Sequence, residues 1–195
     1  MSKVKNSVGP RWAKFCGWLL RRMGWRTVSG PATEPKVILL GAPHTSVLDF
    51  LICYLSYAQF GRLAHIMIKK EFFFWPLGSI LRACGAVPVD RKSATSAVMS
   101  LIKIMNEEEV FHFGISPEGT RKATKHWKTG YRLIAQKTGA VVYGTFFDWR
   151  TKQVGKGEKI EVTDDEKTDL RNLYEYYKSL NLHGFHEDGY NLGES

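Results

Sequence analysis

Short apolar runs alternate with longer stretches of helical periodicity along most of this sequence. The apolar runs that we expect to be strands are residues 37–40, 65–68, 85–91, 110–115 and 141–147. The stretches with apolar residues at helical spacing are residues 46–60, 94–106, 127–138 and 164–180, with a short helix through Ile80 and Leu81. Strands that alternate with helices pair in parallel, because each helix carries the chain back across the sheet. The sequence therefore predicts an α/β fold with a mixed, mainly parallel sheet flanked by helices.

Three parts of the chain differ in character. Residues 1–26 are expected to hold an amphipathic, membrane-associating helix, and residues 27–182 the main domain. Within that domain the glycines of residues 151–162 lie between two short runs, which predicts a hairpin. Residues 183–195 are rich in glycine and are expected to form a flexible tail.

The first helix should open at Pro10 and run to about Met23. Its apolar stripe is expected to hold Trp12, Phe15, Cys16, Leu19 and Met23, flanked by Arg11, Lys14, Trp18, Arg21 and Trp25. Tryptophan mixed with arginine and lysine suits a helix that lies in the interface of a bilayer. An ordinary amphipathic helix packed on the domain would give the same pattern, and the sequence leaves both interpretations open.

The charge of the chain indicates an anionic partner. A net charge of +9 and an isoelectric point near 9.5 favour nucleic acid, a phosphate-bearing substrate or an acidic membrane surface. The basic residues are scattered and no nucleic-acid reader motif is present, so we expect no nucleic acid. No stretch approaches the roughly 18 uncharged apolar residues of a membrane span. We therefore expect peripheral or monotopic attachment to the cytoplasmic face of a membrane.

The remaining compositional features are the cysteines and a run of aromatic residues. Cys16, Cys53 and Cys84 are too far apart for a CxxC site and fit a reduced compartment. Residues 72–77 are densely aromatic and follow Lys69 and Lys70. Such a run fits either a packed core or the floor of a groove for an acyl chain.

The clearest chemical signal is His44 followed by Asp49. In one continuous helix these side chains would point about 140° apart, so His44 must lie in the turn before the helix. There the imidazole could fold back onto the carboxylate, as a general base with the acid that orients it. The alternative is structural: Ser46 can cap the helix with Asp49 three residues later, leaving His44 as an ordinary loop histidine.

Charged groups gather after three of the predicted strands. The first set is His44 and Asp49, the second is Lys69, Lys70 and Arg91, and the third is residues 118–121. If the sheet brings these turns together, one base faces several cations, which suits an acceptor with a hydroxyl and an anionic group. A nucleophilic serine is not expected, because Pro117 after Ser116 has no N–H for an oxyanion hole.

No metal site is expected. The spacing of His183, His186 and Asp188 would suit a metal, but these residues lie in the expected tail.

Four sequence blocks together resemble the glycerolipid acyltransferase family. They are His44-x-x-x-x-Asp49, Lys70-Glu71 with Pro76 and Gly78, Gly85-x-x-x-x-Asp90-Arg91, and Pro117-Glu118-Gly119-Thr120-Arg121. The resemblance implies transfer of a fatty acyl group from acyl-CoA or acyl-carrier protein to a lysophospholipid such as 1-acyl-glycerol-3-phosphate. It makes His44 the base and Asp49 its partner. It assigns acceptor binding to Lys70, Arg91, Glu118, Gly119, Thr120 and Arg121. It implies no cofactor beyond the acyl co-substrate.

Two features keep other functions open. Residues 140–144 lack the proline usual in the family's fourth block, and the chain is short, as in enzymes that act on lyso-ornithine or other amino-acid lipids. From another class, a basic membrane-binding module without catalysis would share the charge and the aromatic residues. We further expect backbone N–H groups at the start of the Ser46 helix to meet charge on the thioester oxygen.

Overall fold

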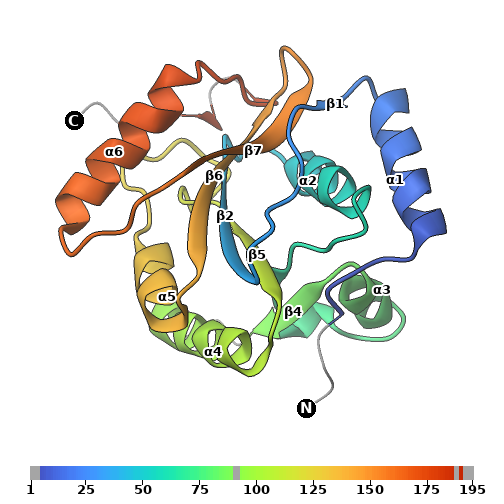
Figure 1. Cartoon of the computed structure of the whole chain (residues 1–195), viewed down its shortest axis with the longest axis horizontal. Coiled ribbons are helices and arrows are strands. Elements are labelled where there is room, and N and C mark those ends of the chain that lie inside the picture. Colours follow the sequence, from blue (N-terminus) through green and yellow to red (C-terminus); the bar gives the residue numbers. More distant parts are fainter. Residues whose placement is uncertain (1–4, 90–92, 187–188, 191–195) are drawn as a thin grey trace.

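The structure is a computed structural model that describes residues 5–89, 93–186 and 189–190. Its helices are α1 (Pro10–Arg22), α2 (Leu48–Ala58), α3 (Leu77–Ala83), α4 (Ala94–Glu107), α5 (Gly130–Thr138) and α6 (Glu166–Ser179), with a 3₁₀ turn η1 (Lys70–Phe72). Its strands are β1 (Arg26–Thr27), β2 (Lys36–Ala42), β3 (Ile66–Lys69), β4 (Ala86–Val89), β5 (Phe111–Ile115), β6 (Val141–Asp148) and β7 (Gln153–Lys159). From β2 to β6, strands and helices alternate as predicted (Figure 1).

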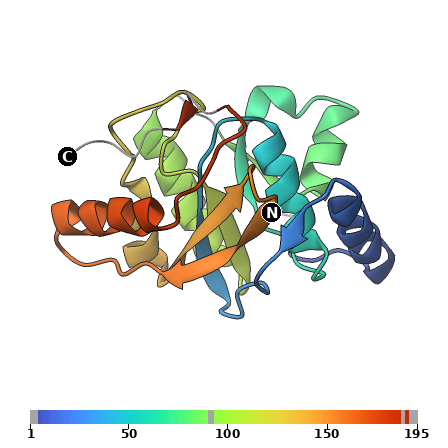
Figure 2. The same ribbon diagram turned by 90° about the horizontal axis from the view of Figure 1, so that it is seen from above.

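The sheet is mixed and mainly parallel. Five strands lie in the order β1-β7-β6-β2-β5, and only β6 and β7 pair antiparallel. Strands β3 and β4 form a separate parallel pair, which a single bridge between His65 and Phe113 joins to β5. Figure 2 shows α1 and α2 on one side of the sheet and α4, α5 and α6 on the other. The predicted α/β class is confirmed.

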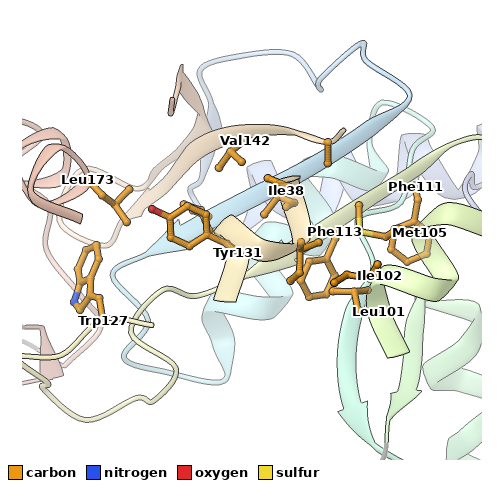
Figure 3. Close-up of a cluster of buried hydrophobic side chains, with 14 of the residues drawn as sticks. Ile38, Leu101, Ile102, Met105, Phe111, Phe113, Trp127, Tyr131, Val142 and Leu173 are labelled. Atoms are coloured by element: carbon orange, nitrogen blue, oxygen red, sulfur yellow. The ribbon is translucent and has the colours of Figure 1, made fainter. Parts of the chain in front are cut away.

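Strand β2 lies inside the sheet, between β6 and β5, and both of its faces are apolar. Ile38 and Leu40 join the larger core cluster, while Val37 and Leu39 pack on the opposite face. A strand buried on both sides reads as a continuous apolar run, as residues 37–40 do. The main cluster draws most of its other members from β5, β6, α4, α5 and α6 (Figure 3). This packing fixes the carboxyl end of β2, where the His44 turn begins.

Two predicted elements differ clearly from the structure. Residues 151–162 do not form a hairpin of their own, because β7 pairs with β6 across the turn after Asp148. The helix predicted from residue 127 begins at Gly130, since Trp127 is buried between Tyr174 and Tyr177 in an irregular loop. It ends as predicted at Gly139, which adopts the left-handed conformation typical of a helix C-terminus.

Helix α1 packs on the protein mainly through small residues. Its buried residues are Ala13, Cys16, Gly17 and Leu20. Small residues let it approach α2 closely, since a Cβ on Gly17 would lie 3.3 Å from the Gln59 side chain. The larger Trp12, Phe15 and Trp18, of which the first two were expected in the apolar stripe, are 42–52% exposed. Helix α1 is therefore both packed on the domain and aromatic on its outer face.

The segment expected to be a flexible tail is ordered where it is described. Backbone N–H groups of Phe185 and His186 donate to Thr45 Oγ1, and His183 donates to Asp148 Oδ1. The ring of Phe185 packs edge-on against Trp149 at 4.6 Å. Residues 183–186 thus cover the turn that follows β2. Within the described part of the chain, no helix is long and apolar enough to span a membrane.

Candidate active site

The turns after β2 and β5 meet at one edge of the sheet. These strands are parallel neighbours, with Leu40 opposite Ile115, so their carboxyl ends lie side by side. Ligand sites in α/β sheets form at this edge. The first turn carries His44 and the second carries Glu118, which are hydrogen-bonded to each other.

His44 and Asp49 are in contact, as the sequence predicted. Nδ1 of His44 lies 3.3 Å from Oδ2 of Asp49. The His44 side chain is 30% exposed whereas Asp49 is almost fully buried, at 1%. With Nδ1 directed to the carboxylate, Nε2 is the ring nitrogen turned away from it. This is the arrangement of an imidazole base oriented by a buried acid.

Three N–H donors hold the carboxylate of Asp49. Oδ2 accepts hydrogen bonds from the backbone N–H of Thr45 at 2.8 Å and of Ser46 at 2.7 Å. Oδ1 accepts one from the indole of Trp149, also at 2.7 Å. Asp49 therefore does more than cap its helix, since its bonds fold the His44 turn back onto it.

Hydrogen bonds at the start of α2 also occupy backbone N–H groups that were expected to bind the thioester oxygen. The N–H groups of Thr45 and Ser46 are committed to Asp49, and that of Leu48 donates to Ser46 Oγ. The structure therefore contradicts an oxyanion hole built from these three groups, because each already has an acceptor.

Glu118 supports the His44 turn from the other side. Both of its carboxyl oxygens lie 3.1–3.2 Å from the backbone nitrogen of His44, and its side chain is buried. Burial raises the pKa of Glu118 to about 8, although the hydrogen bond from His44 opposes the shift and the charge of Asp49 adds to it. Its contact is with the backbone of His44, so Glu118 helps to position the His44 turn.

Gly119, Thr120 and Arg121 line the same cavity as His44. Gly119 has φ +67, and a Cβ there would lie 3.0 Å from Cγ of Lys128. Thr120 accepts a hydrogen bond from the Lys122 N–H, and Arg121 is exposed. The sequence missed Lys128, which also lines the cavity and whose backbone N–H donates to the Pro117 carbonyl at 2.6 Å.

Two further residues, Lys70 and Arg91, were predicted to bind the acceptor. Lys70 is exposed on η1 and is not among the residues that line the cavity. Arg91 lies outside the described residues. Among the residues that are described, no three histidines, cysteines or carboxylates are grouped to hold a metal.

The cavity beside His44 has a volume of about 1030 Å³. Most of its exposed lining is apolar, and side chains of α2, α4 and α5 contribute to it, among them Phe50, Tyr54, Ala97, Val98 and Ile134. Strand residues such as Phe113, Ile115, Phe147 and Val154 also line it. A cavity of this size with a few polar groups at one end suits an elongated apolar ligand with a charged head.

The chain is similar to known acyltransferases. The profile of the Acyltransferase family matches residues 26–147. Over 101 residues the chain is 35% identical to a glycerol-3-phosphate acyltransferase of Pseudoalteromonas atlantica, covering 49% of this chain and 12% of that protein. Over 134 residues it is 31% identical to a protein of the same name from Histophilus somni, covering 65% and 16%. The match thus spans less than a fifth of the length of each of these curated relatives.

A solved structure shares the fold. It is the 1-acyl-sn-glycerophosphate acyltransferase PlsC of Thermotoga maritima, with a TM-score of 0.60 and 20% sequence identity. The match covers 86% of this chain and 75% of that one.

Proposed function

Because this chain belongs to the glycerolipid acyltransferase family, we propose that it is an O-acyltransferase with His44 as its general base. The acyl donor is acyl-CoA or acyl-carrier protein. The acceptor is the hydroxyl of a lysophospholipid such as 1-acyl-glycerol-3-phosphate. The observation that carries this proposal is the contact of His44 Nδ1 with buried Asp49 at the rim of a large apolar cavity.

The chemistry needs a base more than any other group. An alcohol is a poor nucleophile at neutral pH, whereas a thioester carbonyl is already activated. Nε2 of His44 takes the hydroxyl proton as the acceptor oxygen bonds to the carbonyl carbon. The carbon–sulfur bond then breaks, and the imidazolium returns the proton to the leaving thiolate. The products are an ester and a free thiol, and the base contributes about 10²- to 10⁴-fold to the rate.

The charged head and the chain of the acceptor take different parts of the cavity. Arg121 and Lys128 lie on its rim and are suited to a phosphate group. The apolar side chains of α2, α4 and α5 suit fatty chains. An acceptor with a phosphate head therefore fits better than an amino-acid lipid whose head carries a cation.

Attachment to a membrane belongs to the same proposal. Trp12, Phe15 and Trp18 on the outer face of α1 are exposed and stacked in series, with ring centroids 5.1 and 5.8 Å apart. Arg11, Lys14 and Arg21 lie on the same helix. This composition supports peripheral or monotopic attachment, with α1 in the bilayer interface at the cytoplasmic face.

The test is acyl transfer by purified protein, followed by mass spectrometry of the lipids. The acceptors are lysophosphatidic acid, glycerol-3-phosphate and lyso-ornithine lipid, each offered with acyl-CoA and with acyl-carrier protein. We expect His44→Ala to lower turnover by about 10²-fold or more. The matched control is His126→Ala, because His126 is an exposed loop histidine. Equal turnover by wild type and His44→Ala would remove His44 from its role, and absence of any acyl product would favour the non-catalytic module.

A further inference from the structure

The aromatic run after β3 is neither core nor cavity wall. Phe72 is 51% exposed, Phe74 58%, Trp75 86% and Ile80 57%. None of these side chains lines the cavity beside His44. Both alternatives suggested by the sequence are therefore wrong, and we call these four side chains the aromatic tip. A soluble surface rarely exposes so many large apolar side chains together.

The turn that carries the aromatic tip is closely packed. The N–H of Gly78 donates to the Phe74 carbonyl at 2.6 Å. A Cβ on Gly78 would lie 2.7 Å from the backbone of Phe73, so only glycine permits this approach. The guanidinium of Arg82 lies 5.1 Å from the centre of the Phe73 ring. The packing of this turn therefore holds the neighbouring aromatic side chains on the surface.

The aromatic tip lies at the edge of the molecule that carries the active site. Strand β3 is joined in parallel to β5 through His65, so its carboxyl end points the same way as those of β2 and β5. The tip follows that end directly through η1. Helix α3 also lies on the same side as α1 in both views (Figures 1 and 2). Cys84 at its end packs against the cluster that contains Cys16 of α1.

The charge around the tip is mainly positive. Lys69, Lys70 and Arg82 contribute three cations, against one anion from Glu71. A segment that anchors a protein in the membrane interface typically places aromatic rings at headgroup depth and surrounds them with lysine and arginine. A surface that binds an acidic protein would carry cations but few exposed aromatic rings. Here Trp75 is the most exposed large apolar side chain among the described residues.

We propose that the aromatic tip is a second docking surface for an anionic bilayer, separate from the outer face of α1. Insertion of Phe74 and Trp75 at headgroup depth sets the active-site edge against the lipid surface. An acceptor then passes from the bilayer to the cavity without crossing bulk water. This consequence rests on the proposed function, but binding of the bilayer by the tip does not.

Vesicle binding tests the surface without any need for activity. The vesicles contain phosphatidylglycerol and phosphatidylethanolamine, and binding is measured by co-sedimentation of the full chain. We expect the double variant Phe74→Ser, Trp75→Ser to bind about tenfold more weakly or worse, because two large apolar side chains no longer enter the interface. Added salt should weaken wild-type binding, since cations near the surface attract anionic lipid.

The matched control is Met99→Ser, because Met99 of α4 is 54% exposed and lies outside both the tip and the cavity. We expect it to bind vesicles as wild type does. The double variant should also keep wild-type turnover on a short-chain acceptor that is monomeric in solution. Unchanged vesicle binding by the double variant, or loss of acyl-carrier-protein binding with vesicle binding intact, would overturn the proposal. Absence of acyl transfer by every variant would refute only the proposed function.

Discussion

The indole N–H of Trp149 donates a 2.7 Å hydrogen bond to Oδ1 of Asp49. The two residues are a hundred positions apart in the sequence, and Trp149 lies beyond the segment that the Acyltransferase profile matches. Its backbone N–H in turn donates to the His183 carbonyl at 2.9 Å. The acid that orients His44 is therefore held by a part of the chain outside the motif blocks, which makes Trp149 a positioning residue.

Trp149→Phe should slow acyl transfer without unfolding the protein. Phenylalanine keeps an aromatic ring against Phe185 but cannot donate to Asp49. A hydrogen bond to a charged group contributes about 1.5–3 kcal/mol, so we expect kcat to fall about tenfold or more. The KM for the acyl donor should hardly change, because Trp149 does not line the cavity. Steady-state kinetics measure both constants, and circular dichroism follows the melting temperature.

The control for this variant is Trp25→Phe. Trp25 is buried and packs edge-on against Trp149, with ring centroids 5.0 Å apart, but it makes no hydrogen bond to Asp49. A comparable loss of kcat in both variants would show that packing, and not the hydrogen bond, matters at Trp149.

Lys128→Ala should weaken binding of acceptors that carry a phosphate. Lys128 lines the cavity beside Arg121 and is exposed, so solvent screens its charge. We expect the acceptor KM to rise roughly fivefold, with kcat within about twofold of wild type. Kinetics with lysophosphatidic acid and with an uncharged monoacylglycerol measure the effect. Lys125→Ala is the matched control, because Lys125 is exposed nearby but does not line the cavity. An equal KM change for both acceptors would contradict a phosphate contact.

Gly119→Ala should reduce both stability and acceptor binding. Gly119 has φ +67, where an alanine costs about 1–2 kcal/mol, and its Cβ would also push against Lys128. Gly139 offers a close control, since it has the same φ but no atom within 4 Å of a Cβ. We expect urea denaturation to show a similar loss of stability for both alanine variants, but a higher acceptor KM only for Gly119→Ala. A raised KM in both would mean that strain alone disturbs the site.

The order and type of most elements could be predicted from the sequence. Residues 37–40 read as a buried strand because both faces of β2 are covered, and Gly139 marked the end of α5. The hairpin prediction failed because the partner of β7 is β6, and local periodicity does not reveal which strand a residue pairs with. The sequence also left open which face of α1 packs on the domain. Large apolar residues normally mark the buried face, but here small residues permit close packing on α2.

The candidate site could be predicted only where its residues lie in compact blocks. The spacing of His44 and Asp49 predicted their contact. Of the block predicted to bind the acceptor, residues 119–121 line the cavity, whereas Glu118 bonds the backbone of His44. Lys128 and Trp149 lie outside these blocks, and the folded chain alone brings them to the site. The segment around Phe185 looked like a tail because its glycines suggested flexibility. Gly184 instead allows close packing, since a Cβ there would lie 2.6 Å from Thr45.

The buried carboxyl of Glu118 should make stability depend on pH. Its pKa is raised from an ordinary value of 4.5 to about 8, with burial as the main cause. Between these values the unfolded chain ionises at Glu118 while the folded protein keeps the proton. The stabilising contribution is therefore full below about pH 4.5 and is lost as the pH rises towards 8.

Glu118→Gln should remove this dependence, because glutamine stays neutral and its side-chain oxygen can still accept the His44 N–H. We expect the wild type to lose on the order of 3 kcal/mol more free energy of unfolding than the variant between pH 5 and pH 8. Urea denaturation at both pH values measures the difference. Glu109→Gln is the control, because Glu109 is exposed and the variant should follow the wild type. If Glu118→Gln lost as much stability as the wild type, Glu118 would have to be ionised in the folded protein, and its support of the His44 turn would be that of a charged carboxylate.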